Sequence, residues 1–197
     1  MTTTRLLVAG LLGGLAMFIW SAIAHMALPL GEAGVAEIPN ETAVLGAMQA
    51  NIGNESGFYV FPGAGVGPSA SKEEREEGMK RMGAEYPKKS SGILVYHPPG
   101  RPFTFGKWLG IEFVAEVIEA MIALFLLAQT RLSTYASRVG FITVAGLLAA
   151  FTTNVSYWNW YGFPTTYTVA YAFTQLIGFL CAGLVAALVL RNVPART

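Results

Sequence analysis

The strongest constraint in this sequence is a set of four long apolar segments. They cover residues 6–28, 106–130, 139–160 and 167–190. The hydrocarbon core of a bilayer is about 30 Å thick, and a helix needs about 20 mostly apolar residues to cross it. Each segment meets that length. The pattern therefore predicts an all-α integral membrane protein, built as a bundle of four transmembrane helices.

The distribution of charge supports this prediction. Charged residues make up 13% of the chain, against about 25% in soluble domains. Nine of the twelve acidic residues and seven of the thirteen basic residues lie between the first two apolar segments. The formal net charge of +1 gives no indication of nucleic-acid binding or of a polybasic membrane anchor.

The first apolar segment has a second interpretation. Ala22-Ile23-Ala24 resembles the small-residue cleavage site that ends a signal peptide. However, the apolar run is longer than the core of about 7–15 residues that signal peptides use. We therefore interpret residues 6–28 as a retained transmembrane helix.

The arginines predict the orientation of the helices. Arg5, Arg131, Arg138, Arg191 and Arg196 fall on one side of a four-span chain, and the short connector 161–166 contains no basic residue. Lys and Arg in short loops favour the cytoplasmic side. The pattern predicts a plasma or inner membrane protein with both termini in the cytoplasm. Residues 29–105 then lie outside.

This first loop is too long for a bare linker and predicts a small mixed α/β extracytoplasmic cap. A helix should begin after Asn40 as N-cap, and residues 57–61 and 92–96 have the composition of short strands that pair. Between the strands, Ser71 and Glu74 have the spacing of a capping box for a charged, solvated helix ending near residue 85.

Two features of the loop could suggest a binding role, but the sequence does not favour one. The glycine-rich segment 63–67 lacks the Lys-Ser/Thr pair of a phosphate-binding loop. His97 stands alone before two prolines, which is typical of a surface histidine. Cys181, the single cysteine, has no partner for an intrachain disulfide and is expected to be a small packing residue.

The second apolar segment carries three carboxylates on one helical face. Glu112, Glu116 and Glu119 have i, i+4 and i+7 spacing. A charge at the bilayer centre costs at least about 2.5–3.5 kcal/mol. These side chains are therefore predicted to be buried within the protein or against a partner.

Polar residues lie in the outer half of the other three segments as well. They are His25 in the first, Asn154 in the third, and Tyr171 and Gln175 in the fourth. The inner halves are almost wholly apolar. The sequence thus predicts a polar pocket beneath the cap, open to the outside above an apolar floor, with Glu32 near its mouth.

Two interpretations of this pocket remain open. His25, Glu112 and Glu116 form a ligand site, with a divalent metal ion as one possible occupant. Alternatively, the polar groups join helices through hydrogen bonds, His25 to Glu112 and Glu116 to Asn154 or Gln175. Small-residue pairs at Gly10 and Gly14, and at Gly106 and Gly110, indicate close helix packing.

The favoured function is binding of a small ligand, a lipid or quinone, or an ion, in a protein embedded in the lipid bilayer. No motif indicates an enzyme, although chemistry on a lipid or quinone is a variant of this hypothesis. The alternative is an accessory or assembly subunit that docks on a membrane-protein partner or forms a homo-oligomer. A proton-coupled carrier ranks last, because the apolar inner half offers no exit.

Overall fold

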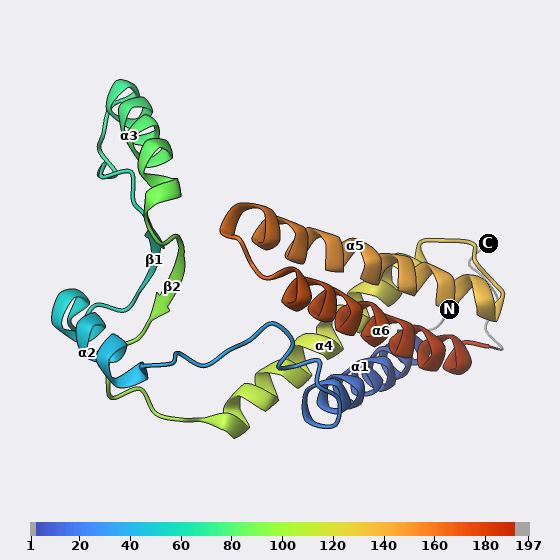
Figure 1. The fold of residues 1–197 in the computed structure, drawn as a ribbon. Coiled ribbons are helices and arrows are strands. Elements are labelled where there is room, and N and C mark those ends of the chain that lie inside the picture. The colour runs from blue at the N-terminus through green and yellow to red at the C-terminus, as the bar shows by residue number, and fades with distance from the viewer. Residues whose placement is uncertain (1–2, 192–197) are drawn as a thin grey trace. The chain divides into compact units, whose positions relative to one another are not determined.

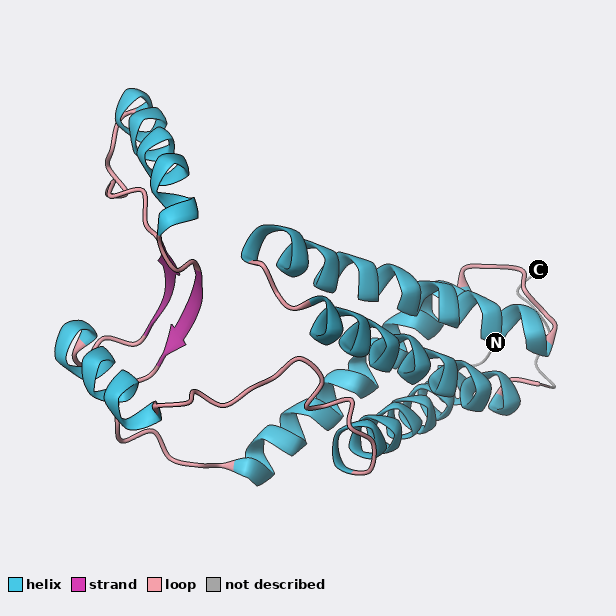
Figure 2. Ribbon diagram, in the orientation of Figure 1, coloured by secondary structure: helices cyan, strands magenta, loops and turns pink. Residues whose placement is uncertain are grey.

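The structure is a computed structural model, and it describes residues 3–191. The described chain is mostly helical, with six α-helices, one 3₁₀ turn and a two-stranded sheet (Figure 2). It divides into two compact units. The helical unit comprises residues 1–36 and 104–197, and the loop unit comprises residues 37–103. Arg196, one of the arginines that predict orientation, lies outside the described residues.

Four long helices form the helical unit (Figure 1). They are α1 (Thr3–Met26), α4 (Phe105–Ala128), α5 (Tyr135–Tyr161) and α6 (Thr165–Val189). Helices α1, α5 and α6 are long and apolar enough to cross a membrane, which indicates a membrane protein. Helix α4 is as long as α1, but it contains Lys107 and the three glutamates. These charged residues exclude it from the group of helices that are apolar enough to cross a membrane.

The helices of this unit pack in the order α4, α1, α6, α5. Extensive contacts join each neighbouring pair, whereas α4 touches α5 and α6 only slightly. The shared core consists of small and aliphatic side chains, among them Met17, Ala120, Leu124, Ile142 and Ala182. Consequently α1 and α6 form the centre of the unit, and the side between α4 and α5 is not closed by helix–helix packing.

Glycines on α1 allow it to approach α4 closely. A Cβ atom on Gly14 would lie 2.5 Å from the Cα atom of Val117, and one on Gly10 would overlap the Met121 side chain. This confirms the small-residue pair predicted in the first segment. The prediction that Gly106 and Gly110 form a second packing site is wrong, because a Cβ atom at either glycine would meet nothing within 4 Å.

A buried arginine joins the ends of two helices. Arg138 is fully buried near the start of α5. Its Nε donates to the Leu132 carbonyl oxygen at 3.1 Å, and Nη1 donates to the Leu190 carbonyl oxygen at 2.5 Å. Because Leu190 follows α6, the guanidinium satisfies a carbonyl that has no partner further along its own helix.

The loop unit contains α2 (Glu41–Ile52), β1 (Gly57–Phe61), α3 (Lys72–Glu85), a 3₁₀ turn at Tyr86–Lys88 and β2 (Gly92–Tyr96). The two strands pair antiparallel, with Gly57 opposite Tyr96 and Phe61 opposite Gly92. The predicted strand pairing is therefore confirmed. Of all the residues in this unit, only Gly78 and Tyr96 are buried.

Helix α3 begins with the predicted capping box. Ser71 Oγ accepts from the Glu74 amide at 3.2 Å, and the Glu74 carboxylate accepts from the Ser71 amide at 2.7 Å. The latter bond lowers the pKa of Glu74. Asn40 is the N-cap residue of α2, as the sequence predicts, although its side chain makes no capping hydrogen bond.

Candidate functional site

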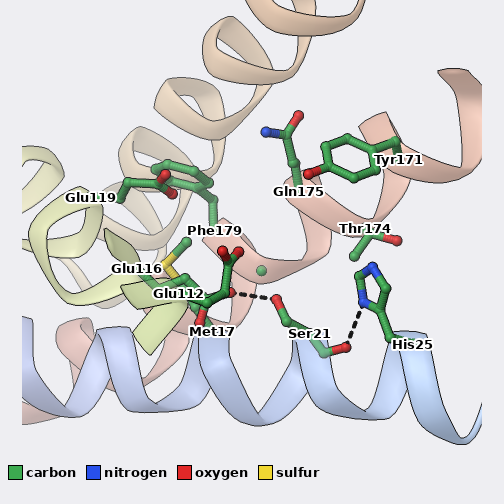
Figure 3. Close-up of a pocket in the computed structure, with 11 residues that line it drawn as sticks. Met17, Ser21, His25, Glu112, Glu116, Glu119, Tyr171, Thr174, Gln175 and Phe179 are labelled. Carbon is green, nitrogen blue, oxygen red and sulfur yellow. Dashed lines mark hydrogen bonds between the residues drawn. The ribbon is translucent and has the colours of Figure 1, made fainter. Parts of the chain in front are cut away.

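A cavity of about 120 Å³ lies among helices α1, α4 and α6 (Figure 3). It exists because α1 contacts both α4 and α6, while α4 and α6 hardly touch each other. Six of the seven residues that the sequence nominated line it, namely His25, Glu112, Glu116, Glu119, Tyr171 and Gln175. The remaining lining residues are Met17, Ser21, Thr174, Gly178 and Phe179.

Helix α1 lines this cavity with Met17, Ser21 and His25. Gly14 precedes them on the same side of the helix, since the four residues follow one another at intervals of three or four. Gly14 sets the distance to α4 at Val117, next to Glu116. The sequence of α1 therefore positions Ser21 beside the central carboxylate of α4.

Glu116 is the most buried acidic side chain of the cavity, with 5% of its surface exposed. Its Oε1 accepts a hydrogen bond from Ser21 Oγ at 2.5 Å. Its Oε2 is buried, and no group among the described residues hydrogen-bonds to it. A buried polar atom without a partner costs about 1–3 kcal/mol. Glu116 thus has hydrogen-bonding capacity that the described chain leaves unused.

All three glutamates face the cavity, but they are buried to different degrees. Glu112 and Glu119 are exposed in the described structure. Glu112 lies two turns into α4, and with His25 it also lines a neighbouring space between α1 and α4. Glu119 in turn lines the space between α4 and α5. Only the middle carboxylate is enclosed by neighbouring helices.

His25 lies at the rim of the cavity and is exposed. Its Nδ1 lies 2.9 Å from the Ser21 carbonyl oxygen. Because a carbonyl oxygen only accepts, Nδ1 carries the proton in this contact, which leaves Nε2 available. The backbone of Gly31 packs directly against the imidazole. Glu32, which was expected near the mouth, is not among the residues that line the cavity.

On the opposite wall, α5 holds Gln175 in position. Asn154 is buried, and its Nδ2 donates to the Ala150 carbonyl oxygen at 2.8 Å and to Gln175 Oε1 at 2.7 Å. Asn154 does not line the cavity itself. Because Gln175 Oε1 is occupied by this bond, its amide nitrogen remains as the group that can donate toward the cavity.

The hydrogen bonds differ from those that the sequence predicted as links between helices. Glu116 bonds to Ser21 and not to Asn154 or Gln175, and His25 bonds to its own helix and not to Glu112. Asn154 is unavailable to Glu116, since both of its amide protons are already directed to other acceptors. Hydrogen bonds between helices therefore use only part of the donors and acceptors that these polar residues offer.

Two polar residues outside the candidate list also shape the site. Ser21 lies one turn before His25 on the same face. Thr174 lines the cavity, and its carbonyl oxygen accepts from Trp20 Nε1 at 2.9 Å, which joins α6 to α1. The Ser21 spacing was readable in the sequence. The Thr174 contact involves a backbone atom and has no sequence signal.

The structure does not assemble the divalent-metal site considered for His25, Glu112 and Glu116. Within residues 3–191, no three His, Cys, Asp or Glu side chains stand close enough together to hold one ion. The cavity walls instead combine three glutamates and one histidine with no lysine or arginine. Such a lining favours a bound group that is positively charged or donates hydrogen bonds.

No protein-family model, curated protein or solved structure matches this chain.

Proposed function

We propose that this chain is a multi-pass membrane protein that binds a small ligand in the cavity among α1, α4 and α6. The ligand is held through a group that is cationic or donates hydrogen bonds. The unused Oε2 of Glu116 is the observation that carries this proposal, because the described chain has enclosed an acceptor without supplying a donor. Ser21, His25, Tyr171 and Gln175 surround it.

The proposal includes α4 as a fourth transmembrane helix. Its exposed face consists of Ile111, Val114, Ile118, Ile122 and Phe125, all of them apolar and more than half exposed. These residues recur at three- and four-residue intervals and form a stripe suited to lipid. The three glutamates lie on a different face, toward the cavity. This arrangement lowers the cost of placing carboxylates at membrane depth.

The arginines supply the proposed orientation. Arg5, Arg131, Arg138 and Arg191 lie at one end of the four helices in a four-span topology, which would be the cytoplasmic end. The residues that line the cavity lie toward the end of α1 and toward the start of α6. In the proposed orientation, both positions belong to the outer half of the helices. The cavity would then receive its ligand from the outside or from the outer leaflet.

Thermal unfolding of the full-length protein in detergent tests the binding function. The probes are small primary amines, quaternary amines and guanidines at millimolar concentration. At least one should raise the Tm of the wild type, and Glu116→Gln should abolish the increase. Glu32→Gln is the matched control, because this glutamate belongs to the same unit but does not line the cavity.

Two results would contradict the proposed function. The first is that no probe stabilises the wild-type protein. The second is that Glu116→Gln responds to every probe as the wild type does while remaining monodisperse.

A second function, that of an accessory subunit, is favoured by the sheet of the loop unit. Phe58, Val60 and Val95 lie on the same face of the hairpin, since Phe58 pairs with Val95, and each is more than half exposed. An isolated two-stranded sheet is marginally stable in water. A protein partner would cover this face. Substituting Val60→Lys should release that partner in a detergent pull-down, whereas purification of this chain alone at low salt would argue against the accessory role.

A further inference from the structure

We propose that the ligand is an amphiphile with an amine head group, and that its apolar chain lies in a groove between α4 and α5. This inference rests on the proposed function, because the amine occupies the cavity at Glu116. It adds the chemical class of the ligand and a second binding region that the sequence does not indicate.

The groove is a consequence of how the helices pack. Helices α4 and α5 hardly touch each other, and the space between them measures about 370 Å³. Its walls are mostly apolar, with Phe179 of α6 between them. The α4 wall is formed by Ile122, Ala123 and Leu126 beyond Glu119, and the α5 wall by Ala145, Leu148, Ala149, Thr152 and Thr153. The small alanines leave the room that a narrow chain needs.

The groove adjoins the polar cavity. Glu119 and Phe179 line both spaces, which places an amine at Glu116 next to the groove. From Glu119 to Leu126 the groove follows α4 for about 10 Å, at a rise of about 1.5 Å per residue. This length accommodates a substantial part of an extended alkyl chain. A purely polar ligand would leave this neighbouring space unused.

Charge complementarity selects the head group. The cavity contains Glu112, Glu116 and Glu119 and lacks lysine and arginine. An ammonium group can donate to the unused Glu116 Oε2, and the other two carboxylates line the same cavity. An anionic head group would meet like charges with no basic side chain to offset them. The acidic cavity therefore favours an amine over a phosphate or carboxylate.

The direction of the groove agrees with the proposed topology. Residues 119–126 of α4 lie further along the helix than Glu112 and Glu116, and in the proposed orientation they lie deeper in the membrane. An amphiphile of the outer leaflet also has its head outside and its chain toward the bilayer centre. It could therefore enter sideways from the lipid without turning over.

Photolabelling of the full-length protein in detergent tests this inference. The probe is a long-chain primary alkylamine with a diazirine at the end of the chain. Labelling should concentrate on Ile122, Leu126 and Leu148. Glu116→Gln should reduce it at least about tenfold, since a charge-assisted hydrogen bond is lost. Ala149→Phe should fill the groove and abolish labelling there, whereas Val144→Phe is the matched control on an exposed part of α5 outside the groove.

The outcomes separate the two proposals. A second apolar space, between α1 and α4, is lined by Met26, Trp108 and Leu109. If a short-chain amine raises the Tm in a Glu116-dependent manner but the photoprobe labels these residues instead, the groove is not the chain site and the proposed function stands. The groove is equally ruled out if the Ala149→Phe variant is labelled there as strongly as the wild type. If neither the Tm increase nor the labelling depends on Glu116, both proposals fail.

Discussion

The helical unit and the loop unit are stabilised in different ways. In the helical unit, distant segments meet through close contacts between helices, as Gly14 meets Val117 and Trp20 meets the backbone of Thr174. The loop unit buries only Gly78 and Tyr96, and most of its hydrogen bonds join residues close in sequence. One unit therefore depends on packing between helices, and the other depends on local caps, turns and one strand pair.

This difference indicates where a single substitution should do the most damage. Close packing transmits a steric change to both helices, because neither backbone can move without losing other contacts. Locally stabilised elements lose one interaction at a time. Substitutions in the helical unit should accordingly have the larger effects, and those in the loop unit should leave the helical unit unchanged.

The largest effect is expected for Gly14→Leu. The new side chain would overlap the backbone of Val117 and separate α1 from α4. Overpacking typically costs about 1–3 kcal/mol, and a clash with backbone belongs at the upper end. The same separation would move Ser21 away from Glu116. The Tm should therefore fall substantially, and amines should no longer raise it.

Gly110→Leu is the matched control for this prediction. It makes the same change on α4 at a glycine whose Cβ would meet nothing within 4 Å. The Tm should stay within experimental error or rise slightly, since leucine favours helix more than glycine does. An equal loss of Tm in both variants would show that the α1–α4 contact is not the cause.

Arg138→Met should produce the second largest effect. The substitution leaves the carbonyl oxygens of Leu132 and Leu190 without the donors that the guanidinium supplies. Each lost partner of a buried group costs about 1–3 kcal/mol, so a loss of about 2 kcal/mol or more is expected in the unfolding of the helical unit. Arg131→Met, at an exposed arginine in the connector before α5, should change the Tm little. Equal Tm values for both variants would contradict the proposed role of Arg138.

The same difference between the units explains what the sequence could predict. The strands 57–61 and 92–96 and the capping box at Ser71 are encoded by neighbouring residues, and the structure confirms them. The structure places His25, Glu116, Tyr171 and Gln175 around one cavity, and their positions along the four apolar segments had suggested a common pocket.

Contacts between helices were less predictable. The pair at Gly10 and Gly14 is a packing site and the pair at Gly106 and Gly110 is not, although the two patterns look alike in sequence. The rotation of α4 about its axis decides that Glu116 is buried while Glu112 and Glu119 are exposed. Nothing in the sequence shows that α4 and α5 remain apart, so the apolar groove became visible only in the structure.

In the loop unit, Tyr96→Phe should have a smaller effect. The hydroxyl of this buried tyrosine lies 3.0 Å from Gln49 Oε1 and 3.0 Å from the Gly53 carbonyl oxygen, which links β2 to α2 and the turn that follows it. Losing this link should cost about 1 kcal/mol. Hydrogen exchange should accelerate in α2 and β2 and remain unchanged in α1, α5 and α6. Tyr86→Phe, at an exposed tyrosine, is the control, and faster exchange throughout the helical unit would contradict the independence of the two units.

The smallest effect is expected for the capping box of α3, and it should depend on pH. The Ser71 amide lowers the pKa of Glu74 below its ordinary value of 4.5. A carboxylate whose folded-state pKa is depressed stabilises the helix above its unfolded pKa, and this contribution is lost as the pH falls through the folded-state value. Amide protection in the first turn of α3 should therefore decrease below about pH 4.5 in the wild type.

Two variants separate the charge of Glu74 from its hydrogen bond. Glu74→Gln can still accept from the Ser71 amide, since glutamine also serves in capping boxes, but it does not titrate. Its protection factors, corrected for intrinsic exchange, should be independent of pH in this range. Ser71→Ala should lower protection at every pH by up to about 1 kcal/mol, because the Glu74 amide loses its acceptor. If Glu74→Gln keeps the full pH dependence of the wild type, another group must control the first turn of α3.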